Sequence, residues 1–192
     1  MDAYLLWEAS NKTIQDTLTQ LPVDRNRISA ILDSTAERIA ALPIETKLNC
    51  VALQAPHRAN LLQTKHWTLE QYPVLQLGTV LPHMGDLPIE EIVKSFIEVA
   101  DFVRRQPENS TGSVGYIRTL ATIPDILERI PIMVVEPASQ QRRLEVLSQR
   151  GRQDLAIIPT DGYIEDGNHR ALALMLAKPE CATLTSWVGR NQ

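Results

Sequence analysis

GYIEDGNHRALALMLAKPE, residues 162–180, contains a strand pattern, a turn and an apolar helix pattern in immediate succession. The strand ends at an Asp-Gly pair, which favours a tight turn. Ala, Leu and Met then dominate residues 168–177, so we expect a helix that is buried in the core. Yet Asn168, His169 and Arg170 stand at its start, where an apolar helix has no packing use for them.

The residues of this turn have the chemistry of an anion site. Gly167 lets the backbone bend sharply and lets another group approach without a Cβ in the way. A helix start presents free backbone N–H groups and the positive end of the helix dipole, and both favour anions. Arg170 adds a planar set of donors that matches phosphate oxygens, and His169 adds a donor that can carry charge or transfer a proton. Together they predict a compact cradle for a phosphate or carboxylate group.

The same residues also have a purely structural interpretation. Asn168 is a good N-cap residue, and an Asp-Gly pair is common in turns. Arg170 could form an ion pair with Asp166 or Glu165 at the surface. His169 could lie in solvent. Local chemistry alone leaves both interpretations open.

The residues around this stretch predict a small mixed sheet. IPIMVVEP, residues 130–137, is an apolar run rich in β-branched residues and indicates a buried strand. Residues 139–151 have a helix pattern that Gly151 ends, and residues 155–160 indicate a second strand. ATLTSWV, residues 182–188, indicates the last strand. The predicted order is strand, helix, strand, turn, strand, helix, strand.

The earlier part of the chain has a different character. Residues 23–43 and 88–105 carry apolar residues at helical spacing, and Asp86 is a candidate cap for the second of these helices. Residues 48–54 and 72–80 are compatible with short strands or with irregular packed segments. This part is therefore predicted to be mainly helical.

The polar, turn-forming segment at residues 106–115 is the best candidate for a linker. We therefore predict an α+β protein with two regions. Residues 1–112 would form a mainly helical accessory region, and residues 113–192 would form a small mixed-sheet core.

Composition limits the functions that the chain can have. The 192 residues are 44% hydrophobic and 22% charged, which is enough for a packed core. A net charge of −4 argues against a protein that coats nucleic acid non-specifically. The sequence has no transmembrane pattern, so we expect no membrane contact and a cytoplasmic location. Cys50 and Cys181 lie far apart and the four histidines are scattered, so we expect reduced thiols and no metal motif.

Residues 128–190, with YIEDGNHRALALMLA at their centre, resemble the core of the ParB/sulfiredoxin superfamily. Members of that superfamily bind the phosphates of a nucleotide at a Gly-x-His-Arg or similar turn. Sulfiredoxins carry their reactive cysteine where this chain has Asn168, so a sulfinic-acid reductase is not expected, because Asn cannot act as a thiolate. The resemblance implies that the phosphates are bound by the residues of the turn, which are Asp166, Gly167, Asn168, His169 and Arg170.

The sequence motif Asp-Gly-x-His-Arg is similar to the turn of the free-serine kinases of this superfamily. Those kinases use a glutamate after the first strand as general base. Glu136 falls near that place. The resemblance implies that Glu136 and His169 are catalytic residues of phosphoryl transfer from a nucleoside di- or triphosphate with Mg²⁺. Glu136 also has a plain interpretation as a surface glutamate at a strand end.

Three functions are compatible with these residues. The first is a nucleotide-binding enzyme, either a phosphotransferase with a small-molecule substrate or a nucleotide hydrolase, that binds ATP, ADP or CTP. The second is a nucleotide-gated, DNA-associated or regulatory module without catalysis, and the third is a ParB-like nuclease. A nuclease would need clustered carboxylates and a basic groove. Because acidic and basic residues balance after residue 127 and acidic residues prevail before it, we expect nucleotide binding and do not favour DNA.

Overall fold

The computed structural model describes residues 40–54, 65–80, 93–136 and 161–191, together with Ser148 and a few positions between 30 and 38. These residues form an α+β fold, as predicted, with one six-stranded mixed sheet in the order β1-β6-β4-β5-β2-β3. The strands are β1 (Lys65–Pro73), β2 (Leu77–Val80), β3 (Val93–Ser95), β4 (Ile132–Val135), β5 (Gly162–Asp166) and β6 (Thr183–Asn191).

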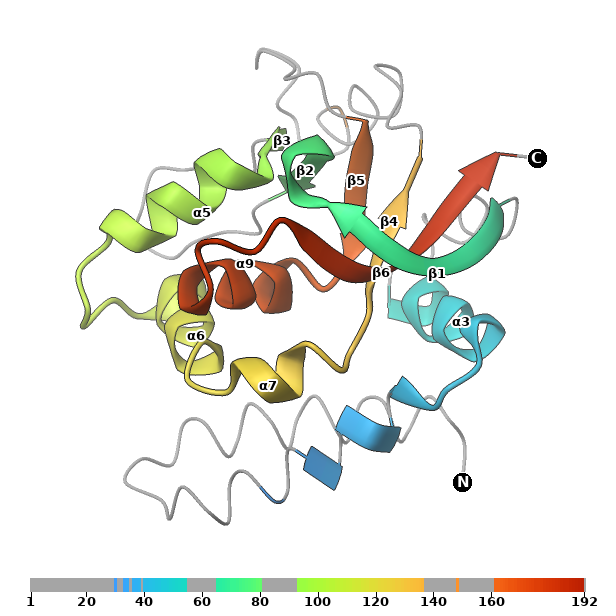
Figure 1. Ribbon diagram of the computed structural model, residues 1–192, viewed down its shortest axis with the longest axis horizontal. Helices are drawn as coiled ribbons and strands as arrows, with labels where there is room; N and C mark the ends of the chain where they lie inside the picture. The colour runs from blue at the N-terminus through green and yellow to red at the C-terminus, as the bar shows by residue number, and fades with distance from the viewer. Residues whose placement is uncertain are drawn as a thin grey trace.

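The described helices lie on both faces of this sheet. Figure 1 shows α9, α5 and α6 on one side of the strands and α3 on the other. None of the described helices is long and apolar enough to cross a lipid bilayer. The helices are α3 (Ile44–Gln54), α5 (Phe96–Arg105), α6 (Gly112–Leu120), α7 (Pro124–Leu127) and α9 (Asn168–Ala177), with a 3-10 turn, η2 (Val74–Gln76).

The sheet combines parallel and antiparallel pairs. β6 pairs antiparallel with β1 and parallel with β4, while β5 pairs antiparallel with β4 and parallel with β2. β3 pairs antiparallel with β2 at one edge. β1, β2 and β3 all precede residue 112, so the sheet includes strands from both of the regions that the sequence suggested.

Successive side chains of β4 point to opposite faces of the sheet, as they do in any β-strand. Ile132 and Val134 belong to the large core around α9. Met133 and Val135 belong to a second cluster, on the side of α3. All of these positions are buried, which explains the continuous apolar run in the sequence.

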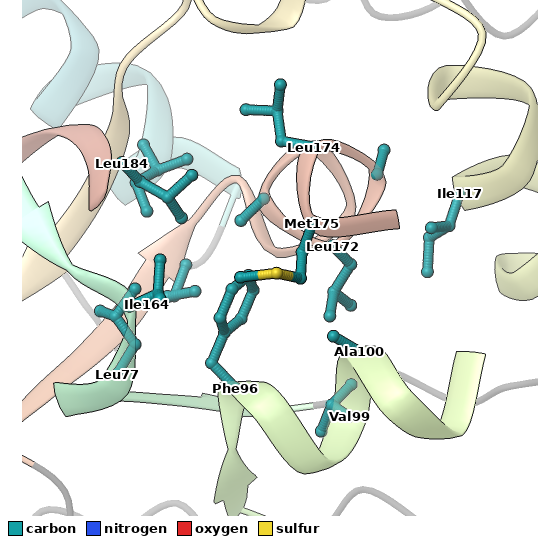
Figure 2. Close-up of a cluster of buried hydrophobic side chains, with 14 of the residues drawn as sticks. Leu77, Phe96, Val99, Ala100, Ile117, Ile164, Leu172, Leu174, Met175 and Leu184 are labelled. Carbon is teal, nitrogen blue, oxygen red and sulfur yellow. The ribbon is translucent and has the colours of Figure 1, made fainter. Parts of the chain in front are cut away.

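The helix α9 is the centre of the larger core. Its residues Ala171 to Met175 are all buried. Figure 2 shows Met175 directed toward Phe96 and Leu172 directed toward Ala100, both on α5, and Ile117 of α6 beside α9. Because neighbours surround α9 on several sides, it is apolar around most of its circumference and needs no polar face.

Several sequence predictions are confirmed. β4 lies within the strand predicted at residues 130–137, and α9 has the predicted bounds of 168–177. The last strand is present and extends as far as Asn191. The predicted helix at residues 139–151, apart from helical Ser148, and the predicted strand at residues 155–160 lie outside the described residues.

The helix predicted at residues 88–105 is shorter than expected. Residues 93–95 form β3, and the helix α5 begins at Phe96. Ser95 replaces Asp86 as its cap, because the Ser95 hydroxyl accepts a hydrogen bond of 3.3 Å from the backbone N–H of Glu98. The apolar spacing continues across this boundary, although Val93 pairs with β2 in the sheet. The sequence pattern therefore does not reveal where the strand ends and the helix begins.

The structure also decides one segment that the sequence left open and corrects another. Residues 48–54, which the sequence left undecided, belong to the helix α3. The predicted linker at residues 106–115 ends early, because the helix α6 begins at Gly112. Only residues 106–111 connect α5 to α6 without regular structure.

Candidate phosphate-binding site

The turn between β5 and α9 depends on Gly167. Its φ of 94° lies in the left-handed region, which residues with a Cβ rarely adopt. A Cβ at this position would lie 2.8 Å from Nη2 of Arg170 and 2.8 Å from Cγ2 of Ile132. The guanidinium group of Arg170 therefore lies directly against the glycine, and the basic side chain and the start of α9 share one corner of the molecule.

Arg170 forms an ion pair with Asp166 at the end of β5. Nη2 of Arg170 lies 2.9 Å from Oδ2 of Asp166, and the two side chains are only 14% and 25% exposed. The structural interpretation of the sequence included this pair but placed it at the surface. Nε of Arg170 is buried and has no hydrogen-bond partner in the described part of the chain, so the carboxylate satisfies only part of the guanidinium group.

Asn168 connects the start of α9 to the neighbouring strand β2. Its Oδ1 accepts a hydrogen bond from the hydroxyl of the fully buried Thr79. Asn168 is the first residue of the helix, and the N-cap position belongs to Gly167, which has no side chain to accept from the helix start. The alternative interpretation of Asn168 as the N-cap residue is therefore wrong.

His169 packs against the helix α6. Its ring lies edge-on to the ring of Tyr116, with 5.4 Å between the centroids and an angle of 69° between the planes. Burial lowers the pKa of His169 below its usual 6.5; the nearby Asp166 opposes this effect and the nearby Arg170 adds to it. At pH 7 the imidazole is therefore predominantly neutral, and it can donate one hydrogen bond without contributing a positive charge.

Lys47 of α3 is a second basic residue that interacts electrostatically with this corner. Its side chain is almost fully buried, and Nζ has no hydrogen-bond partner among the residues that the structure describes. The pKa of Lys47 is lowered to about 8, mainly by burial; the positive charge of Arg170 contributes to the lowering, and Asp166 acts in the opposite direction. The three charges that interact here are thus two cations and one carboxylate.

Sequence reasoning missed Lys47. Its signal is a lysine in line with Ile44 and Leu48, at the i, i+3 and i+4 spacing of one helix face, and both neighbours pack against the cluster of Met133 and Val135. The signal was hidden because residues 48–54 were compatible with a strand. Lys47 also lies more than a hundred residues before Arg170, so no local motif connects the two.

The structure does not bring Glu136 to the turn. Val135 pairs with Tyr163 near the beginning of β5, whereas Gly167 follows the end of that strand. Glu136 therefore lies about five residues of strand away from Gly167, or roughly 16 Å at 3.3 Å per residue. Glu136 is instead paired with the end of β6, where its Oε2 lies 2.7 Å from Nε of Arg190. The two predicted catalytic residues, Glu136 and His169, thus belong to different ends of the sheet.

Two further features define what surrounds the turn. No group of three or more His, Cys, Asp or Glu side chains that could hold a metal ion occurs in the described ranges. A separate cavity of about 380 Å³ lies near the C-terminal half of α9, with Leu127, Ile130 and Leu184 among its apolar walls. Lys178 at its rim is paired with Glu128 at 2.7 Å, so this cavity lacks the unpaired charge that marks the turn.

No protein-family model, no curated protein and no solved structure matches the chain.

Proposed function

We propose that the chain is a ParB-like protein that binds the phosphate groups of a nucleotide at the turn between β5 and α9. The observation that carries this proposal is the position of the Arg170 guanidinium group against Gly167 at the start of the helix. A flexible basic side chain on an exposed surface would not support it. Here the side chain is held by Asp166 and by burial, so its donors are oriented before a ligand arrives.

The physical reason is that three sources of positive potential act at one corner. The first turn of α9 has backbone N–H groups without partners inside the helix, and the helix dipole adds a partial positive charge. Among the described residues, Nε of Arg170 lacks an acceptor, Lys47 contributes a second cation, and Asp166 is the carboxylate that pairs with Arg170 and acts on Lys47. An anion placed here gains hydrogen bonds and relieves the repulsion between the two cations.

The residues of the turn then have distinct roles. Gly167 allows Arg170 to lie against the backbone at the start of α9, Arg170 binds the phosphate, and Asp166 orients Arg170. His169 donates a hydrogen bond from a neutral imidazole. Asn168 is a positioning residue, since its amide oxygen is occupied by Thr79. Mg²⁺ would arrive with the nucleotide and be bound mainly by phosphate oxygens.

The separation of Glu136 from the turn favours nucleotide binding over phosphoryl transfer by the predicted pair of residues. A general base must lie within hydrogen-bond distance of the proton that it removes, and Glu136 lies roughly 16 Å from the turn along the strand. A nucleotide-gated module, in which binding changes shape or partner choice, is therefore the form of the proposal that the geometry supports best.

The test is calorimetry of ATP, ADP and CTP with Mg²⁺ on the wild type and on two arginine variants. Arg170→Ala should weaken binding by at least about tenfold, because it removes a charge-assisted contact to phosphate. Arg104→Ala is the matched control, since Arg104 also pairs with an aspartate, Asp101, but lies on the exposed part of α5. It should bind as the wild type does.

Absence of binding heat for all three nucleotides in the wild type would overturn the proposal. Equal loss of affinity in both arginine variants would overturn it too, because the effect would then come from total charge and not from the turn. Circular dichroism of each variant checks that the fold is retained.

A further inference from the structure

We propose that Lys47 is a second cationic ligand of the bound phosphate and that it makes the site prefer dianionic phosphate groups over monoanionic ones. This inference rests on the proposed function, because it concerns the ligand of the same site. It adds a residue from the other face of the sheet, far from the turn in sequence, and it defines the charge of the group that fits.

The first support is the unusual placement of the side chain. Lys47 lies on the face of α3 that packs against the sheet, between the apolar residues Ile44 and Leu48. It is 3% exposed, and its Nζ has no hydrogen-bond partner among the described residues. Lysine is rarely buried so completely unless its charge is paired, because removing an ammonium group from water is costly. An acceptor that arrives with a ligand explains why this side chain is retained.

The second support is the position of Lys47 relative to the turn. Met133 of β4, which faces α3, is directly opposite Asp166 of β5, because the register of the two strands shifts between Met133 and Val134. The irregularity brings Asp166 to the face of the sheet that α3 covers. The charges that act on the Lys47 ammonium group are accordingly those of Arg170 and Asp166. Lys47 from one layer and Arg170 from the other thus approach the same end of β5.

The third support is the balance of charge among the groups on the neighbouring elements. Asp166 is already paired with Arg170, and the ammonium group of Lys47 has no hydrogen-bond partner in the part of the chain that the structure describes. His169 is uncharged at neutral pH, and Glu45 of α3 lies on the exposed side of its helix. On the neighbouring strands that the structure describes, Tyr163 and Glu165 of β5 and Lys65 of β1 are further titratable groups, and each has interactions of its own.

A phosphate dianion matches this arrangement better than a monoanion does. One negative charge would be stabilised by Arg170 and the start of α9, and the second would be stabilised by Lys47. A monoanion would leave one cation buried without compensation. Phosphate monoesters have a second pKa of about 6, so a terminal phosphate is a dianion at the pH values where the site is tested.

The proposal has a signature that a structural lysine would not produce. Lys47 in the free protein has a pKa of about 8, so it is only about half protonated at pH 8. A dianion bound beside it raises that pKa, because an opposite charge favours the charged form. Binding should therefore take up about half a proton at pH 8. Affinity should fall up to about tenfold per pH unit above pH 8.

The experiment is calorimetry with ADP, and with ADP methylated on its terminal phosphate, which removes one negative charge. Each titration is made at pH 8 in two buffers with different ionisation enthalpies, so that the number of protons taken up is measured directly. The proteins are the full-length wild type and Lys47→Met, which replaces the ammonium group by an apolar side chain of similar length.

The wild type should bind ADP at least tenfold more tightly than the methylated ADP and take up about half a proton. Lys47→Met should bind ADP more weakly, lose most of the preference and take up no proton. If the wild type binds ADP without proton uptake and Lys47→Met has the same affinity and preference, this inference is overturned while the proposed function stands. If the wild type binds no nucleotide, the proposed function fails and the inference fails with it.

Discussion

A single backbone angle makes the turn before α9 possible. The φ of 94° at Gly167 is strained for any residue with a Cβ, and that Cβ would also meet Arg170 and Ile132 at 2.8 Å. The close approach of Arg170 to the backbone therefore depends on glycine at this position.

We expect Gly167→Ala to lower the free energy of unfolding by about 1–3 kcal/mol, since it combines an unfavourable φ with overpacking. Nucleotide binding should fall with it, because Arg170 must move. Gly167→Asn is the matched comparison: Asn tolerates the left-handed region better than Ala but has the same Cβ. Urea denaturation measures both variants. Equal or higher stability of Gly167→Ala relative to the wild type would show that the turn has another conformation.

The beginning of α5 shows how a sequence pattern can hide an element boundary. The apolar spacing runs through residues 92–103, yet the chain pairs in the sheet as far as Ser95 and becomes helical only at Phe96. The change occurs where a serine can accept from the helix start. Phe96, the first residue of the helix, is fully buried against the core.

Ser95→Ala should lower the free energy of unfolding by about 1 kcal/mol, because the backbone N–H of Glu98 loses its acceptor. Ser95→Asp should keep most of the stability, since a carboxylate also caps a helix and suits the positive end of its dipole. Thermal and urea denaturation of the two variants compare them directly. If alanine and aspartate have the same effect, Ser95 does not act as the cap, and the helix begins elsewhere.

At the scale of the whole molecule, α3 packs on one face of the sheet and α9 on the other, and a buried lysine interacts with the charges at the end of β5. Such a lysine carries a stability cost that changes with pH. In the unfolded chain its pKa is near 10.5, and in the folded protein it is about 8. Between these values the unfolded chain binds a proton that the folded protein does not. Stability from this group therefore rises as the pH increases from 8 to 10.5.

Lys47→Met should accordingly be more stable than the wild type at pH 7, by about 1–3 kcal/mol, and the difference should shrink as the pH rises toward 10.5. Urea denaturation of both proteins at several pH values isolates the effect, because all other groups titrate equally in the two. Lys178→Met is the control: Lys178 is paired with Glu128, which raises its pKa, so its effect changes only above this window. A constant difference between Lys47→Met and the wild type would contradict a lowered lysine pKa.

The sequence by itself determined the local elements whose signals lie within a few neighbouring residues. The β-branched run of β4, the Asp-Gly turn and the apolar α9 were all predictable, because strand period, helix period and the freedom of glycine are local properties. The ion pair between Arg170 and Asp166 was also among the alternatives that the sequence offered, although the structure buries it.

Only the tertiary structure decided which distant residues meet at that turn. Lys47 interacts there from another layer, Thr79 contacts Asn168 from a neighbouring strand, and Glu136 lies at the far end of β5. The order of strands in the sheet determines these relations, and that order depends on packing between residues far apart in the chain. A sequence pattern records how each element buries its own face, but not which element covers it.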